Sequence, residues 1–188
     1  IGFNSIFLKA NKDLLILLKK FNLNFSNIKK YIELTETKII KLYNHKNNTF
    51  TCKDLKNRKK IRIPSITNYF LLYADLNNEL INKRIIKSLK SYNKNEKYIF
   101  SSIKPNHQSF EEKRYWRGPV WINCNWIIYQ GLKNKDKLFS EVVKQKTIKI
   151  VEKKGFHEYY SCKSGKPMGA NNFSWSAALY LDLVLTKC

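Results

Sequence analysis

The chain has 188 residues, enough for one domain, and 43% of them are hydrophobic and 14% aromatic. This apolar content can form a sizeable core and excludes a disordered basic tail. Lysine or asparagine interrupts every apolar run well before the about 18 residues of a membrane-spanning helix. No targeting signal is visible, which slightly favours a cytoplasmic location, although the chain begins with Ile1 and we expect it to belong to a longer protein.

The formal net charge of +22 raises the question of a nucleic-acid partner, since lysine and arginine neutralise phosphates. Lysine is spread along nearly the whole chain, however, and only five residues are arginine, the side chain suited to bidentate phosphate and base contacts. The charge therefore reads as compositional, and nucleic acid is the less favoured partner. For the best candidate for a nucleic-acid patch, a solvated turn between two extended segments is the favoured interpretation. This candidate patch comprises Lys53, Lys56, Arg58, Lys59, Lys60 and Arg62.

The first half of the chain predicts helices in antiparallel pairs. Apolar residues recur at helical spacing from Phe3 to Leu18 and, after Ser26 as the expected N-cap, from Ile28 to Tyr43. The helical period is lost over 44–64, where short extended pieces around a polar turn predict a small hairpin. Helical spacing then returns in two segments that an asparagine-rich corner separates, at 65–76 and 77–90.

A long polar segment opens the second half. Residues 91–119 are expected to form an irregular loop that crosses the surface. Pro119 then lies near the first turn of an apolar helix over 121–132, and Gly155 ends another over 136–153. These two helices make a further hairpin.

The end of the chain is read as a glycine-containing loop followed by a last helix over 173–185. This helix is apolar almost all round, so we expect it to be buried. The count reaches seven helices in consecutive pairs, which predicts an all-α toroid or solenoid rather than a βαβ fold.

Two aromatic-rich segments stand out as candidates for chemistry. One, 114–126, combines three tryptophans, two arginines and a Gly-Pro turn, and the other, 155–176, contains Glu158 and Trp175. Aromatic faces pack on the C–H faces of sugars while arginine and asparagine bond to their hydroxyls, so the composition suits a carbohydrate site. Glycoside hydrolysis also needs two carboxylates, about 6.5 to 9.5 Å apart in inverting enzymes, and Glu158 is the natural candidate for one. Composition alone leaves open that the tryptophans are core anchors and Glu158 a solvated carboxylate.

These segments resemble the C-terminal part of glycoside hydrolase family 63, especially its mannosylglycerate hydrolase-like and processing glucosidase-like members. The similarity rests on the runs YWRGPVWINCNW, GFHEYY and FSWSAAL, which begin at Tyr115, Gly155 and Phe173. The start of the chain, GFNSIFLKAN from Gly2, and the run IRIPSI from Ile61 also look like that family. The resemblance thus covers nearly the whole chain in the right order.

The resemblance implies an (α/α)6 toroid that hydrolyses an α-glucoside or α-mannoside with inversion and without a cofactor. It implies that Glu158 is the general base that activates water, while the general acid is an Asp upstream of the region that matches Gly2. Asp13, which lies in the first helix outside the matching motif, is not assigned that role. The sugar subsite is implied to include Trp116, Arg117, Gly118, Trp121 and, as a second aromatic wall, Trp175.

Seven helices are about half of the twelve in such a toroid, so residues 1–188 are expected to be the C-terminal part of one catalytic domain, with apolar faces left unpaired. Hydrolysis is then expected of the full-length protein. The alternatives are a catalytically inactive remnant that still binds carbohydrate and a basic protein that binds nucleic acid. No metal site is expected, because the four cysteines form no C-x-x-C pair and have no histidine at ligand spacing. They are Cys52, Cys124, Cys162 and Cys188.

Overall fold

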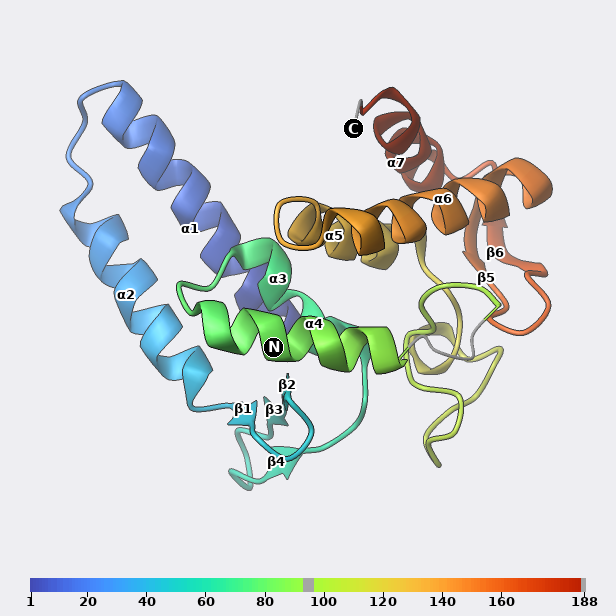
Figure 1. Ribbon diagram of the computed structural model, residues 1–188, viewed down its shortest axis with the longest axis horizontal. Coiled ribbons are helices and arrows are strands. Elements are labelled where there is room, and N and C mark those ends of the chain that lie inside the picture. The colour runs from blue at the N-terminus through green and yellow to red at the C-terminus, as the bar shows by residue number, and fades with distance from the viewer. Residues whose placement is uncertain (93–96, 187–188) are drawn as a thin grey trace. The chain divides into compact units, whose positions relative to one another are not determined.

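The computed structural model describes residues 1–92 and 97–186 (Figure 1), so Cys188 lies outside the described residues. The chain forms two compact units, each with its own core. In the described residues, no helix is both long and apolar enough to cross a membrane. Unit 1 comprises Ile1–Arg62 and Asn68–Ser88, and unit 2 comprises Ile63–Thr67 and Leu89–Cys188.

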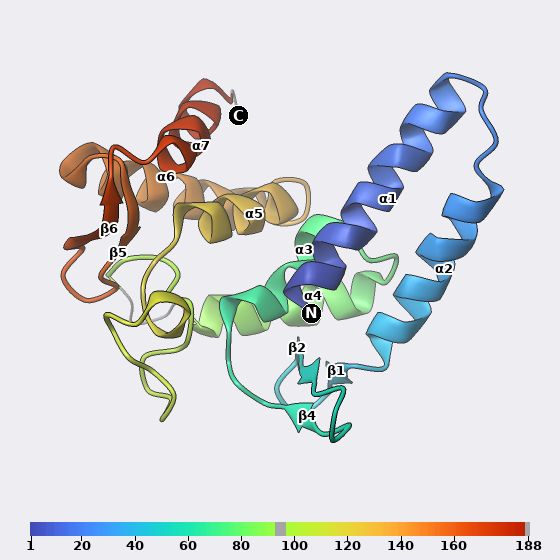
Figure 2. The same ribbon diagram turned by 180° about the vertical axis from the view of Figure 1, so that it is seen from behind.

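Unit 1 is built on a long helical hairpin. Helices α1 (Gly2–Lys20) and α2 (Ser26–Ile40) lie side by side and antiparallel in both views (Figures 1 and 2), as the apolar spacing predicts. The expectation that Ser26 is the N-cap of the second helix is wrong. Ser26 is the first helical residue, and the side chain of Asn24 accepts its backbone N–H at 3.0 Å. An asparagine two residues before the helix start therefore takes the role expected of the serine.

Two small hairpins follow where one was expected. The sequence predicted the extended pieces around 49–51 and 61–63, but not their partners. The expected second helix reached Tyr43, whereas α2 ends at Ile40 and Tyr43 pairs with Phe50; the partner of the other piece had no assigned structure. The basic cluster proposed as a nucleic-acid patch lies on the second hairpin and its turn, where Lys53 faces Lys60 across the strands. The pairs are β1 (Tyr43–Asn44) with β2 (Thr49–Phe50), and β3 (Cys52–Lys53) with β4 (Lys60–Ile61).

The helix expected over 65–76 is broken into a 3₁₀ turn, η1 (Ile66–Tyr69), and a single α-helical turn, α3 (Leu71–Ala74). It stops at Asp75, whose φ of 54° is left-handed. The next helix, α4 (Glu79–Tyr92), begins and ends two residues later than predicted. The side chain of Asn78 accepts the backbone N–H of Ile81 at 3.0 Å, which explains why the helix begins there.

Unit 2 packs three helices against one another: α5 (Ile122–Leu132), α6 (Lys137–Lys154) and α7 (Ser174–Leu185). Asp136 is the N-cap of α6, and its carboxylate accepts the N–H of Phe139 at 3.1 Å. Gly155, with a φ of 81°, ends the helix as predicted. The seven predicted helices therefore all have a counterpart among the described residues, although that of 65–76 is a single turn.

Three predictions for unit 2 are wrong. The glycine-containing loop is an antiparallel hairpin of β5 (His157–Tyr160) and β6 (Pro167–Asn171). The segment expected to cross the surface is partly core, since residues 99–103 are buried and the Asn125 side chain bonds to the backbone N–H of Phe100 at 2.8 Å. Finally, α7 is not buried all round, because α5 and α6 pack against one side of it and Leu185 is 75% exposed.

Candidate active site

The candidate base, Glu158, lies on β5 at an irregular point of the hairpin. His157 pairs with Asn171 and Tyr159 with Met168, so two steps along β5 correspond to three along β6. The extra β6 residue places Gly169 and Ala170 opposite Glu158. The backbone N–H of Ala170 donates to Oε2 of Glu158 at 3.1 Å. Irregularities of this kind re-aim a side chain, and here the carboxylate is held by the opposite strand.

The second oxygen of Glu158 is held from a different part of unit 2. Tyr115 begins the 3₁₀ turn η2 (Tyr115–Arg117), and its hydroxyl donates to Oε1 of Glu158 at 2.6 Å. This hydrogen bond raises the pKa of Tyr115, because the phenol is a donor to a carboxylate only while it is protonated. Each oxygen of the carboxylate thus accepts one bond from the protein and keeps a further lone pair for another donor.

An aromatic cluster fixes the position of Tyr115. The rings of Trp116 and Trp121 stack 4.3 Å apart at an interplanar angle of 7°. Trp121 is 2% exposed, its indole N–H donates to the Tyr115 carbonyl at 3.1 Å, and its ring lies 4.9 Å from that of Tyr159. Trp116 is 44% exposed although one of its faces lies on Trp121. The buried tryptophan therefore supports an exposed one that directly follows Tyr115, the residue bonded to Glu158.

Arg117 and Gly118 lie in the same stretch with different surroundings. Arg117 donates from Nε to the carbonyl of Ser109 at 3.1 Å and forms an ion pair with Glu111 at 2.9 Å. Its guanidinium thus connects η2 to two residues of the preceding loop, Ser109 and Glu111. Gly118 is buried, and a Cβ there would lie 2.3 Å from the carbonyl oxygen of Glu111, so only glycine fits without moving the loop.

Trp175 lies in the first turn of α7 and is 44% exposed, with its ring 6.1 Å from that of Phe173. Two bonds join this helix start to the strand that carries the carboxylate. The N–H of Phe173 donates to the carbonyl of Phe156, and the hydroxyl of Ser176 donates to that of His157 at 2.6 Å. The structure therefore anchors Trp175 to the base of β5 and brings Tyr115, Trp116, Trp121 and Glu158 into direct contact with one another or with Tyr159.

Sequence reasoning assigned no role to Tyr115, Tyr159, Gly169 or Ala170. Tyr115 is the first residue of the run that resembles the family, and its position directly before Trp116 is the sequence feature that could have indicated a role. The contact of Ala170 was not predictable without the hairpin. Among the described residues, no group of three or more His, Cys, Asp or Glu side chains is placed to hold a metal ion.

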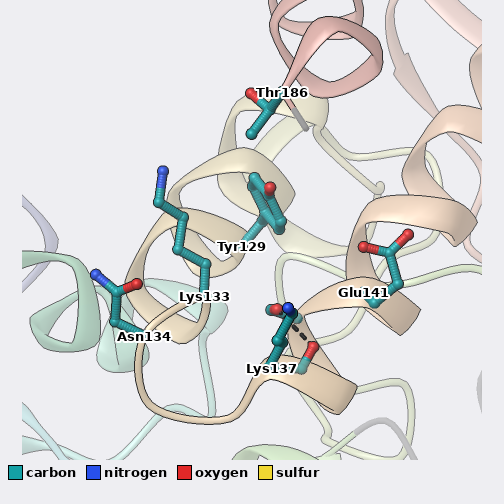
Figure 3. Close-up of a pocket in the computed structure, with 7 residues that line it drawn as sticks. Tyr129, Lys133, Asn134, Lys137, Glu141 and Thr186 are labelled. Carbon is teal, nitrogen blue, oxygen red and sulfur yellow. Dashed lines mark hydrogen bonds between the residues drawn. The ribbon is translucent and has the colours of Figure 1, made fainter. Parts of the chain in front are cut away.

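A hollow of about 260 Å³ lies at the other end of α5. Figure 3 shows Tyr129 and Lys133 from α5, Lys137 and Glu141 from α6, and Thr186 after α7 around it. Its lining includes no residue predicted for the sugar site. The predicted residues therefore lie on β5, in and directly after η2, and in the first turn of α7, and none of them lines this hollow.

Comparison with known families identifies the domain to which these residues belong. The model of the mannosylglycerate hydrolase MGH1-like glycoside hydrolase domain matches residues 1–176. The chain belongs to this family. Both the hairpin that carries Glu158 and the stretch from Tyr115 to Trp121 lie inside the matched region.

Individual family members show the same relationship. Mannosylglycerate hydrolase from Thermus thermophilus is 30% identical over 184 residues, which cover 96% of this chain and 44% of that protein. A crystal structure of the GH63 mannosylglycerate hydrolase from T. thermophilus in complex with Tris matches with a TM-score of 0.92 and 29% identity, over 96% of this chain and 44% of that one. Further structures of that enzyme hold glucose, or Tris and D-glycerate.

A more distant neighbour, the neutral trehalase from Saccharomyces cerevisiae, shares the fold with a TM-score of 0.74 at 16% identity, over 96% of this chain and 36% of that one. The predicted all-α fold of the (α/α)6 class is confirmed by these MGH1-like and trehalase neighbours. The chain spans less than half the length of the T. thermophilus relatives it matches.

Proposed function

We propose that the full-length protein is an inverting α-glycosidase and that this chain supplies its general base, Glu158. Both compact units would then belong to the C-terminal part of one catalytic domain. The observation that carries the proposal is the Glu158 carboxylate, which is held by the Tyr115 hydroxyl and the Ala170 N–H, with the partly exposed Trp116 next to Tyr115 in the chain. Family membership adds that these residues lie in a glycoside hydrolase domain.

The geometry suits a base better than a nucleophile that must approach the sugar itself. The two protein donors occupy one acceptor position on each oxygen, which fixes the plane of the carboxylate and leaves one lone pair on each for a water molecule. A water bound there donates one proton to Glu158 while its oxygen attacks the anomeric carbon. The glycosidic C–O bond breaks at the same time, and its electron pair stays on the leaving oxygen.

Charge balance requires a second group on the opposite side of the sugar. The leaving oxygen takes a proton from a general acid, so one proton is lost from that acid and one is gained by Glu158. We assign the general acid to the part of the full-length protein upstream of Gly2. The product sugar then has the anomeric configuration opposite to that of the substrate.

For the substrate we propose a small α-mannoside or α-glucoside of a short organic acid such as glycerate. The support comes from the relatives, which are named mannosylglycerate hydrolases and of which one has been crystallised with glucose and with D-glycerate. In this chain, the exposed ring of Trp116 offers an apolar surface to the C–H face of the sugar. Trp175 is the second aromatic group that we assign to the same sugar.

The test is Glu158→Gln in the full-length protein, assayed against mannosylglycerate and glucosylglycerate. The amide keeps the shape but cannot take a proton, so kcat should fall by at least about a thousandfold while the dissociation constant for the product sugar changes less than threefold. Glu33→Gln, on an exposed face of α2, is the matched control and should leave both values unchanged. NMR of the first turnovers should show the inverted anomer.

Three results would overturn the proposal. Turnover close to that of the wild type in Glu158→Gln would show that Glu158 is not the general base. Retention of the anomeric configuration in the product would exclude an inverting mechanism. Sugar binding by a wild-type protein that shows no turnover of any α-glucoside or α-mannoside would establish the carbohydrate-binding remnant instead.

A further inference from the structure

A second hollow in unit 2 carries a set of charges that the hydrolytic reaction does not use. Its volume is about 170 Å³, and it lies between the second half of α6 and the residues Lys97 and Tyr98. Four of the six side chains that line it are lysines, and none is a carboxylate. They are Lys97, Tyr98, Lys146, Lys149, Ile150 and Lys153.

Three of the six lysines of α6 lie on the face of the helix that lines this hollow. Lys146, Lys149 and Lys153 stand at positions i, i+3 and i+7, which are neighbours on a helix surface. Like charges at this spacing repel one another and destabilise a helix. Lys149 and Lys153 are exposed, and neither forms an ion pair with any residue that the structure describes. In the described part of the chain, the repulsion between these two lysines is therefore not offset by an ion pair.

The floor of the hollow belongs to the core. Ile150 is buried in the cluster that contains Ile122 and Tyr160, and Tyr98 packs against that cluster. A Cβ at Gly165 would lie 2.6 Å from the Tyr98 ring, so the turn of the β5–β6 hairpin closes tightly over this ring. The shape of the hollow is thus set by packed residues, while the exposed ammonium groups of Lys149 and Lys153 can turn toward a ligand.

We propose that this hollow, the four-lysine site, binds a small phosphate-containing anion with two or more negative charges. Its volume is below the about 300–1,000 Å³ of pockets for drug-sized ligands, which favours a phosphate or pyrophosphate group over a whole nucleotide. Compact ammonium groups on flexible stems suit such an ion. The inference does not depend on the proposed glycosidase activity.

A nucleic-acid strand fits the four-lysine site less well. Strand binding without sequence preference uses open aromatic rings on which successive bases stack. Tyr98 is the one aromatic ring that lines this hollow, Lys97 lies 5.5 Å over its centroid, and Gly165 lies against its edge. Lys97 therefore covers one face of this ring, and the hollow has no second ring in its lining on which a neighbouring base could stack, whereas Lys149 and Lys153 are exposed to an oxyanion.

The larger hollow of Figure 3 differs in its charge. There, Glu141 lies in the same lining as Lys133 and Lys137, so a carboxylate offsets part of the positive charge. The four-lysine site has no such group in its lining. An anion should consequently prefer the smaller hollow.

The test is calorimetric titration of the full-length protein with sodium pyrophosphate, in buffer whose ionic strength is held constant with sodium chloride. The wild type should bind saturably, and the charge-reversal variant Lys149→Glu/Lys153→Glu should bind at least tenfold more weakly. Lys29→Glu/Lys30→Glu is the matched control, because it makes the same change in net charge at two exposed positions of α2. It should retain the wild-type affinity. Bound pyrophosphate should also raise the midpoint of thermal unfolding in the wild type and the control.

Four outcomes would overturn the four-lysine site. The first is the absence of saturable binding to the wild type. The second is an equal loss of affinity in both double variants, which would show that only net charge matters. The third is unchanged binding in Lys149→Glu/Lys153→Glu when its unfolding midpoint shows that it is folded. The fourth is that a single-stranded oligonucleotide binds through the same two lysines more tightly than pyrophosphate does. This result would identify nucleic acid, and not a small anion, as the ligand of the site.

Discussion

The hydroxyl of Tyr115 donates a 2.6 Å hydrogen bond to Glu158 from a position 43 residues earlier in the chain. This bond joins η2 to the β5–β6 hairpin and orients the carboxylate whose other oxygen is bound by Ala170. The orientation of the proposed base thus depends on two segments, each held by its own packing.

Tyr115→Phe should lower kcat of the full-length protein by about tenfold to a hundredfold, since a hydrogen bond to a charged group of this strength is lost while the ring remains. KM should change less than threefold, because the stacked tryptophans keep their places. Steady-state kinetics on the preferred glycoside measure both values. A variant with unchanged kcat would show that Tyr115 does not position Glu158.

The same bond predicts a behaviour at high pH. Because the pKa of Tyr115 is raised by its bond to Glu158, the phenol stays protonated at neutral pH and the contact is lost only as the pH rises through that raised value. Ultraviolet titration of wild type and Tyr115→Phe should therefore differ by one phenol that ionises above its ordinary value of 10. A difference spectrum that develops below pH 10 would contradict this prediction.

Gly118→Ala should disturb the loop that presents Tyr115 and Trp116. The new Cβ would meet backbone atoms of Glu111 and Glu112 at 2.3–2.7 Å, and backbone cannot move aside by changing rotamer. We expect a loss of about 1–3 kcal/mol in the free energy of unfolding, the usual cost of overpacking, together with reduced activity. Denaturant titration provides the measurement, and a free energy within 0.5 kcal/mol (about the scatter of neutral surface changes) of the wild type would be inconsistent with this close approach.

Gly169→Ala should act on the base directly. Gly169 has a φ of 74°, and a Cβ there would lie 2.6 Å from Oε2 of Glu158. Gly155→Ala is the matched control, because Gly155 has a similar φ of 81° but only the His157 ring nearby, at 3.8 Å. Both variants incur backbone strain of about 1 kcal/mol. Only Gly169→Ala should lower kcat strongly, and equal kinetic losses in the two variants would attribute the effect to strain alone.

Cysteine reactivity should report the opening of unit 2. Cys124 is fully buried in α5, and burial raises the pKa of its thiol well above the ordinary value, so the reactive thiolate is scarce at pH 8. Cys52 is partly exposed. Iodoacetamide should modify Cys52 in the native protein and reach Cys124 only when denaturant opens α5, as peptide mass spectrometry would show. Rapid native labelling of Cys124 would contradict the buried position.

The sequence could predict those elements whose signals are local. Asp136 before an apolar period and Gly155 after it are sufficient to delimit α6, and the helical spacing from Phe3 to Leu18 is sufficient for α1. The resemblance also singled out Glu158 and its aromatic neighbours as candidates. These features depend on residues close together in the chain.

The remaining features depend on contacts that no local pattern records. The β6 strand contains proline, glycine and asparagine, which are depleted in strands, so the hairpin was read as a loop. Residues 99–103 lie in a segment that is polar and irregular as a whole, yet Asn125 satisfies backbone groups of Ile99 and Phe100 and allows their burial. The exposure of α7 was not predicted, because the apolar composition of a helix indicates burial but does not identify the elements that pack against it.

Because the pairing of β5 and β6 is uneven, the length of β6 determines which backbone amide faces the Glu158 carboxylate. Removing one residue between Met168 and Asn171 would allow a regular ladder, with every side chain proposed for the reaction still present in the protein. The amide now bonded to Oε2 would nevertheless face another position, because a one-residue slip exchanges the two faces of a strand. The geometry of the site therefore depends on the number of residues in β6 as much as on the identity of Glu158.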